Sequence, residues 1–115
     1  MIVGTGVDLI EVQRIQHAIE RWGDHFLNHV YTPQEIAWAK TFKFPYTHYA
    51  GRFAAKEAVF KALGDPNATW QDMIILNDSQ GKPVCTYRKN NFKHKIHISI
   101  SHIKNYALAQ AIVEA

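Results

Sequence analysis

Apolar residues recur at steps of three and four early in the chain, which is the spacing that places side chains on one face of a helix. They are Val12, Ile15, Ile19, Trp22 and Phe26. Gly23 predicts that this helix weakens or ends there. The apolar run before it, residues 2–9, predicts a buried strand whose one charged residue is Asp8.

Two further helices are predicted from capping signals and composition. The segment 32–35, Thr-Pro-Gln-Glu, combines an N-cap, a proline at the first helical position and an acid that completes a capping box. The alanine-rich segment from about residue 48 has strong helix propensity up to Gly64, which is a good C-cap. We therefore expect a short helix followed by a long one.

The rest of the chain has strand patterns. Residues 73–76 and 83–87 predict two strands joined by a turn at 77–81. In residues 95–102, isoleucine alternates with polar residues, which is typical of a half-buried strand. Residues 106–113 fit a strand or a helix, and the short gap before them favours a hairpin.

Composition limits the classes of protein that the chain can belong to. With 115 residues we expect one domain, residues 1–115, and a site shared between subunits is worth considering at this size. Neither a membrane span nor a signal peptide is predicted, so we expect a cytoplasmic protein. The single cysteine, Cys85, excludes an intrachain disulfide and is interpreted as a packed thiol.

Net charge favours a partner that carries negative charge. The value is +3 with neutral histidines, which leaves nucleic acid, an anionic cofactor and an acidic protein all open. No P-loop is present, and the Gly-Thr-Gly at 4–6 is too short for a dinucleotide fingerprint.

Three charged residues stand in apolar surroundings. Asp8 needs a cation, unless it accepts hydrogen bonds from the next helix. A helical projection places Glu57 and Lys61 in the stripe that the long helix should bury, although an ordinary intrahelical ion pair is the simpler interpretation. Two carboxylates without a cysteine suit Mg²⁺ that keeps several waters, whereas no zinc-binding spacing occurs among the histidines.

Several other residues are individually weak candidates for phosphate contacts. They are Arg52, Lys56, Lys61, Lys82, Ser99, Ser101 and His102.

Two sequence motifs carry a family resemblance. Residues 4–15, GTGVDLIEVQRI, resemble the opening motif of the holo-acyl-carrier-protein synthases, which are 4'-phosphopantetheinyl transferases. Residues 52–64, RFAAKEAVFKALG, resemble their second motif, and the segments at 70–72, 81–83 and 99–111 resemble later blocks. Segments 43–48 and 86–95 have no clear counterpart.

The resemblance implies a fold, a reaction and a set of roles. The fold is α+β, with a small antiparallel sheet packed with a long central helix and shorter helices. The reaction moves 4'-phosphopantetheine from coenzyme A to a serine of an apo acyl carrier protein and leaves adenosine 3',5'-bisphosphate. By resemblance, Asp8 and Glu57 are the Mg²⁺ ligands, and Glu57 and Lys61 are the catalytic residues. The positions that resemble coenzyme A contacts are Arg52, Lys61, Lys82, Pro83, Ser101 and His102.

Partners follow from the same resemblance. Arg14 and Arg21, on the outer face of the first helix, are expected to meet an acidic carrier protein. Members of the family are homotrimers with sites between subunits and take part in fatty-acid biosynthesis. The alternatives are a coenzyme A binding protein without transferase activity and a basic nucleic-acid binding module.

Overall fold

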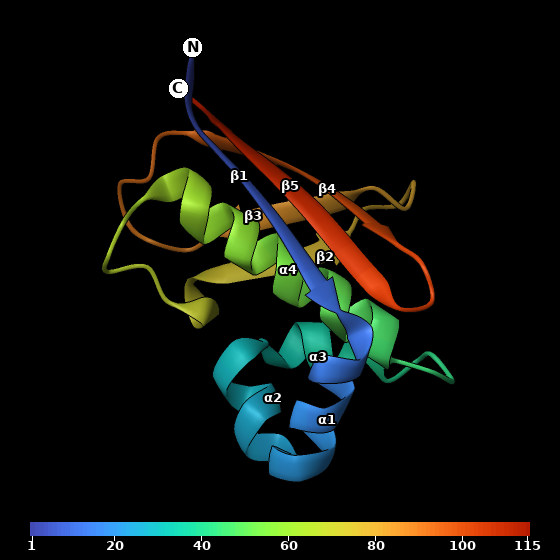
Figure 1. The fold of residues 1–115 in the computed structure, drawn as a ribbon. Helices are drawn as coiled ribbons and strands as arrows, with labels where there is room; N and C mark the ends of the chain where they lie inside the picture. The colour runs from blue at the N-terminus through green and yellow to red at the C-terminus, as the bar shows by residue number, and fades with distance from the viewer.

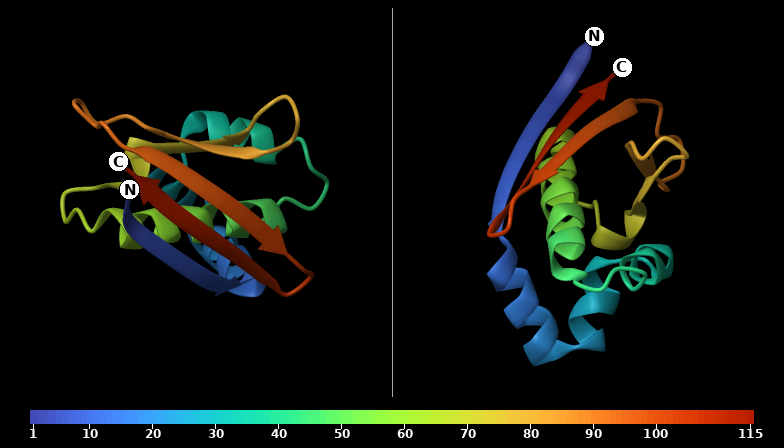
Figure 2. Two further views of the ribbon diagram at one scale, coloured as in Figure 1. Left: turned by 90° about the horizontal axis from the view of Figure 1, so that it is seen from above. Right: turned by 90° about the vertical axis from the view of Figure 1, so that its right-hand side faces the viewer.

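The computed structural model describes residues 1–115 and places one long helix between two antiparallel sheets (Figures 1 and 2). The elements follow the chain in the order β1 (Ile2–Glu11), α1 (Val12–Trp22), α2 (Asp24–Val30), α3 (Pro33–Ala39), α4 (Tyr46–Leu63), a 3₁₀ turn (Trp70–Asp72), β2 (Met73–Asn77), β3 (Pro83–Tyr87), β4 (Lys95–His102) and β5 (Tyr106–Glu114). The α+β fold expected from the family resemblance is confirmed.

The larger sheet has the order β1-β5-β4, and the smaller sheet consists of β2 and β3. All pairings are antiparallel. The α4 helix crosses one face of the larger sheet, and α1, α2 and α3 gather around its first turns (Figure 1). The β4–β5 hairpin and the β2–β3 hairpin expected from the sequence are both confirmed.

The core has two parts, which follow one another along α4. The first joins α4 to both sheets, and the second joins it to α1, α2 and α3. Alanines such as Ala50, Ala54 and Ala58 are fully buried, which lets neighbouring backbones come close to the helix. No helix of the structure is long and apolar enough to cross a membrane.

Two details of the N-terminal segment differ from the sequence-based expectations. The strand β1 is not buried, because Val3, Val7 and Leu9 project from the outer face of an edge strand and are exposed. Gly23, with φ of 55°, ends α1 as predicted, but Phe26, which was placed on the apolar stripe of that helix, belongs to a separate helix, α2. Trp22 was expected in the core but is 55% exposed, because the turn at Gly23 follows it directly.

The helix caps were predicted correctly. Thr32 Oγ1 accepts a hydrogen bond from the Glu35 backbone N–H, and the Glu35 carboxylate accepts one from the Thr32 N–H. Gly64 ends α4 in the left-handed conformation with φ of 62°. These signals depend on neighbouring residues only, so they can be recognised in the sequence without knowledge of the tertiary fold.

Candidate active site

Glycine allows β1 to lie directly against α4, and this contact positions Asp8. A Cβ atom at Gly4 or Gly6 would lie 1.9 or 2.0 Å from the carbonyl oxygen of Ala62 or Ala58. Because strand side chains alternate, Asp8 projects from the same face as these two glycines. The glycines therefore bring the carboxylate of Asp8 next to the second half of α4.

Lys61 joins the helix to the strand. Its Nζ donates hydrogen bonds to the Val7 carbonyl at 2.8 Å and to Asp8 Oδ1 at 3.3 Å. Asp8 thus has a cation as partner, and the first N–H of α1, that of Val12, donates instead to the Asn105 carbonyl. No ion pair joins Lys61 to Glu57 within the helix.

Glu57 completes a cluster of two carboxylates and one amine. Burial raises the pKa of Glu57, and the charge of Asp8 raises it further, while Lys61 opposes the shift. A cation placed between Glu57 and Asp8 would stabilise the charged form of Glu57 in these surroundings. No group of three or more His, Cys, Asp or Glu side chains is placed to hold a metal, so water and substrate oxygens would complete a metal site here.

The expectation that α4 buries Glu57 and Lys61 is wrong. Glu57 is half-buried and the Lys61 side chain is 53% exposed, because both lie at the margin beside β1. The buried cations of this helix are Arg52 and Lys56. Since α4 is covered by the two sheets over residues 54–62 and by helices around its first turns, a single apolar stripe does not describe it.

Lys56 belongs to the core rather than to a phosphate site. Its Nζ lies 2.7 Å from Glu35 Oε1 and donates to the carbonyls of Val30 at 2.8 Å and Trp70 at 3.0 Å. Glu35 also accepts from the Ile75 N–H at 2.7 Å. All three protons of the Lys56 ammonium have partners inside the protein, so the interpretation of Lys56 as a phosphate contact is wrong.

Arg52 lines a surface cavity of about 340 Å³ on the other side of α4. Its guanidinium lies 4.0 Å above the Trp38 ring and donates to Asn77 Oδ1 at 2.7 Å. Burial lowers the pKa of Arg52 to about 10, which leaves it charged at neutral pH. Pro83 and His102, two of the expected coenzyme A contacts, also line this cavity.

The other expected contacts lie outside the cavity lining. The Lys82 side chain is exposed on the loop after β2, where its backbone N–H donates to Asp78 Oδ1 at 2.9 Å. Ser99 and Ser101 alternate with the inward isoleucines of β4 and are exposed on the outer face of the sheet. Trp38, Phe42 and His48 line the cavity and were not singled out from the sequence. Of these, His48 had a detectable signal, because its four-residue spacing from Arg52 puts both on one helix face.

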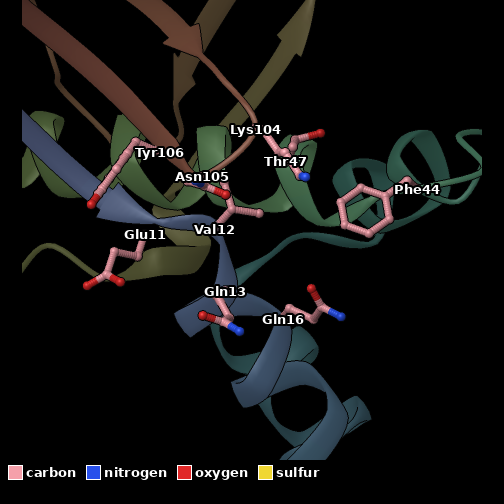
Figure 3. Close-up of a pocket in the computed structure, with 9 residues that line it drawn as sticks. All are labelled: Glu11, Val12, Gln13, Gln16, Phe44, Thr47, Lys104, Asn105 and Tyr106. Atoms are coloured by element: carbon pink, nitrogen blue, oxygen red, sulfur yellow. The ribbon is translucent and has the colours of Figure 1, made fainter.

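Arg14 and Arg21 are both exposed on α1, as expected. The Arg21 guanidinium lies 5.0 Å from the centre of the Trp22 ring. Beside α1 lies a second cavity of about 630 Å³, bordered by the first turn of α4 and the β4–β5 turn. Figure 3 shows Gln13 and Gln16 on its α1 side and Lys104 and Thr47 across from them.

Cys85 is packed beneath α4 and is no candidate nucleophile. Burial raises the pKa of its thiol to about 12, so the thiolate is scarce at neutral pH. The packed-thiol interpretation agrees with this environment.

The candidate residues form two groups on opposite edges of the larger sheet. Asp8, Glu57 and Lys61 lie at β1, which is one edge strand, whereas His102 lies on β4, which is the other. Arg52 lies with the β4 group. One chain alone therefore does not bring the two groups into a single pocket.

The chain is similar to known proteins over nearly its whole length. Residues 4–111 match the sequence model of the 4'-phosphopantetheinyl transferase superfamily. A holo-[acyl-carrier-protein] synthase of Protochlamydia amoebophila is 44% identical over 97% of this chain and 98% of its own. One of Koribacter versatilis is 37% identical over 99% of both chains.

Solved structures have the same fold. A holo-(acyl-carrier-protein) synthase of Bacillus anthracis in complex with CoA (3',5'-ADP) has a TM-score of 0.87 at 39% identity, over 100% of this chain and 98% of that one. The Helicobacter pylori enzyme in complex with coenzyme A has a TM-score of 0.85 at 29% identity, over 96% of this chain and 99% of that one.

Proposed function

The chain belongs to the 4'-phosphopantetheinyl transferase superfamily, and we propose that it is a holo-acyl-carrier-protein synthase. It transfers the 4'-phosphopantetheine group from coenzyme A to a serine of apo acyl carrier protein and releases adenosine 3',5'-bisphosphate. The observation that carries this function is near full-length identity of 37% and 44% to two such synthases. The cluster of Asp8, Glu57 and Lys61 supplies the charges that the reaction needs.

Mg²⁺ fits the two carboxylates of this cluster. Asp8 and Glu57 offer hard oxygen ligands, and burial together with the charge of Asp8 raises the pKa of Glu57. We propose that these two residues hold the ion, which neutralises negative charge on the diphosphate of coenzyme A when bound. Lys61 Nζ, held between the Val7 carbonyl and Asp8, contributes a further positive charge at the same place.

The transfer makes one bond and breaks another. The serine oxygen bonds to the β-phosphorus, and the bond from that phosphorus to the oxygen of the bisphosphate leaving group breaks. The serine proton passes to Glu57 directly or through a water that Glu57 orients, because a serine hydroxyl is a poor nucleophile at neutral pH. The raised pKa of Glu57 brings its basicity closer to the operating pH. Lys61 aligns the phosphate and offsets its charge.

We assign carrier recognition to the exposed arginines of α1. Carrier proteins of this kind are acidic, and Arg14 and Arg21 lie one above the other on the outer face of the helix. Charges at such a surface chiefly steer and orient the partner. The coenzyme A contacts expected from the resemblance, Arg52, Lys82, Pro83, Ser101 and His102, remain proposals, as does the cytoplasmic location.

We also propose a homotrimer with sites between subunits. The outer face of the larger sheet carries exposed apolar residues, among them Leu9, Tyr106 and Leu108. Leu9 and Leu108 are paired directly across β1 and β5, so they form a continuous apolar surface. Association through this face would allow the β1 edge of one subunit to complete a site with the β4 edge of the next.

The test is the mass of an apo acyl carrier protein after incubation with the chain and coenzyme A. A gain of about 340 Da, the mass of a phosphopantetheine group, is expected with Mg²⁺ and not with EDTA. A mass gain of the carrier protein in the presence of EDTA would contradict the requirement for Mg²⁺. No gain with several apo carriers, despite binding of coenzyme A, would identify a coenzyme A binding protein without transferase activity.

A further inference from the structure

His48, in the first turn of α4, lies in the segment to which the family resemblance gave no role. Its ring stacks on Phe42 with the centres 3.7 Å apart and at an interplanar angle of 21°. It meets Trp38 edge-on at 5.2 Å and His102 at 5.7 Å. Rings from the segments on both sides therefore fix the imidazole at the wall of the cavity beside Arg52.

Arg52, which lines this cavity, has one donor without a partner. The residue is only 6% exposed, and its Nε has no hydrogen-bond partner although Nη2 donates to Asn77. A buried donor without a partner costs free energy unless a ligand or water satisfies it. The guanidinium is thus incompletely satisfied within the protein, and its positive charge at the cavity favours a ligand with acceptor oxygens.

The charges of the residues that line the cavity favour an anionic ligand. None of the 11 residues that line it is acidic. Two of them, Thr47 and His48, belong to the first turn of an 18-residue helix that has no acidic residue there and no side-chain cap. The N-terminus of such a helix carries positive partial charge and free N–H groups, which favour a phosphate.

Coenzyme A carries two anionic groups, the reacting diphosphate and a phosphomonoester on its ribose. The diphosphate belongs with Asp8, Glu57 and Lys61 if the chain has the function proposed above, on which this inference rests. The cavity lies across α4 from that cluster, at the β4 edge, which in the trimer proposed above meets the β1 edge of the next subunit, so it is available for the phosphomonoester. We propose that His48 is a specificity-determining residue that binds this phosphomonoester, together with Arg52, and takes up a proton as it does so.

The groups around His48 make proton uptake the expected response. The charged or titratable ones are Arg52 on its own helix and His102 on β4, while Trp38, Phe42 and Asn77 from the other elements carry no charge. Burial lowers the pKa of His48, and His102 and Arg52 lower it further. The free imidazole is therefore neutral at pH 7, and a bound dianion raises its pKa again.

Isothermal titration calorimetry of the full chain with coenzyme A and with 3'-dephospho-coenzyme A tests the proposal, because the two ligands differ only in the phosphomonoester. Titrations at pH 7 in two buffers of different ionisation enthalpy measure the protons taken up. The unsubstituted chain should prefer coenzyme A by about tenfold or more and take up more protons with it than with the dephosphorylated ligand.

His48→Gln keeps hydrogen-bonding groups but cannot gain charge. We expect it to lose most of the preference and of the additional proton uptake, with affinity for 3'-dephospho-coenzyme A unchanged. His94→Gln, the same change at an exposed histidine that packs edge-on against Phe92 outside the cavity, should behave like the unsubstituted chain.

Three other outcomes of these titrations would contradict the proposal, each in a different way. If His48→Gln keeps both the preference and the uptake, His48 does not bind the phosphomonoester, and the transferase function is untouched. An equal loss of affinity for both ligands would make His48 a structural residue of the cavity instead. Failure of the unsubstituted chain to bind either ligand would overturn the proposed function and this proposal together.

Discussion

At the scale of single residues, the chemistry of the candidate site rests on a carboxylate that is held at a margin rather than in the core. Glu57 is half-buried and faces the charge of Asp8, and both conditions raise its pKa. A glutamine of the same shape would keep the packing and remove the carboxylate that we propose as metal ligand and base.

Glu57→Gln should therefore lower turnover by about 100-fold or more without unfolding the chain, because glutamine suits a helix equally well. The carrier mass assay measures turnover, and circular dichroism measures the fold. Glu114→Gln, the same change in an exposed carboxylate that pairs with His97 at 3.0 Å, is the matched control. Near-normal turnover of Glu57→Gln would remove this residue from the site.

Arg14→Ala should weaken the carrier interaction and leave coenzyme A binding unchanged, because Arg14 is exposed on α1 and lies outside the Arg52 cavity. Removing one steering charge is expected to raise KM for the carrier by about three- to tenfold, and by less at high salt. Steady-state kinetics with each substrate varied separate the two effects. Equal losses for both substrates would instead indicate misfolding or a misplaced surface.

The roles of individual residues could be predicted only in part from the sequence. Asp8 and Lys61 are 53 positions apart, and the sequence indicated only that Asp8 needs a cation, without identifying Lys61 as that partner. The burial of Lys56 was not predictable, since its partners come from three other segments and no local sequence pattern indicates them. His48 was overlooked because its neighbours Trp38, Phe42 and His102 are brought together only by the tertiary fold.

At the scale of elements, the ion pair between Glu35 and Lys56 ties several segments to α4. The end of α2, the cap of α3, the 3₁₀ turn and β2 each contribute one backbone group to it. Such a pair stabilises little compared with an apolar core, but loss of one partner leaves a buried charge uncompensated.

Lys56→Met should destabilise the fold by about 3–5 kcal/mol, because Glu35 and two carbonyls lose their partner. Urea unfolding monitored by fluorescence measures this change. Lys56→Met combined with Glu35→Gln should recover part of the loss, since the combination leaves no buried charge. A single variant as stable as the unsubstituted chain would show that the pair has no structural role.

The contact between β1 and α4 gives a second prediction at this scale. Gly6→Ala puts a methyl group 2.0 Å from the Ala58 carbonyl, so β1 must move away from the helix and carry Asp8 with it. We expect a loss of about 3 kcal/mol in stability and a marked loss of transferase activity. Gly51→Ala is the milder comparison for stability, because the nearest atom, at 3.1 Å, belongs to the flexible side chain of Ile100. If Gly6→Ala kept full activity, the position of Asp8 would not matter for the reaction.

Element boundaries show what local sequence signals can decide. The capping box at Thr32 and the left-handed Gly64 were predicted, because each depends on neighbours within a few residues. The end of α1 at Gly23 was predicted, but the separate helix α2 was not, since the apolar spacing continues beyond Gly23 to Phe26. The exposed face of β1 was taken for a buried one because exposed and buried valine look alike in a sequence.

At the scale of the whole molecule, the apolar outer face of the larger sheet is the surface that we propose for association between subunits. Leu9 and Leu108 are 62% and 43% exposed and lie directly opposite each other. An apolar face of this kind on a small chain is typical of a subunit interface.

Leu9→Asp should therefore convert the proposed trimer to monomers and abolish turnover, because a carboxylate cannot be buried unpaired at the interface. Sedimentation velocity measures the assembly, and the carrier mass assay measures the turnover. Val84→Asp, which adds the same charge at a residue 45% exposed on β3, should leave the trimer intact. A monomeric and active unsubstituted chain would contradict the shared site.

The pairing of β1 with β5 also sets the order in which the chain can fold. Residues 2–11 find their only strand partner at residues 106–114, so this pairing closes a loop of nearly the whole sequence. Such non-local pairing is slow, and it cannot begin during synthesis until β5 has left the ribosome. Until then β1 is an apolar strand without a strand partner, and its pairing with β5 is among the last contacts that the chain can make.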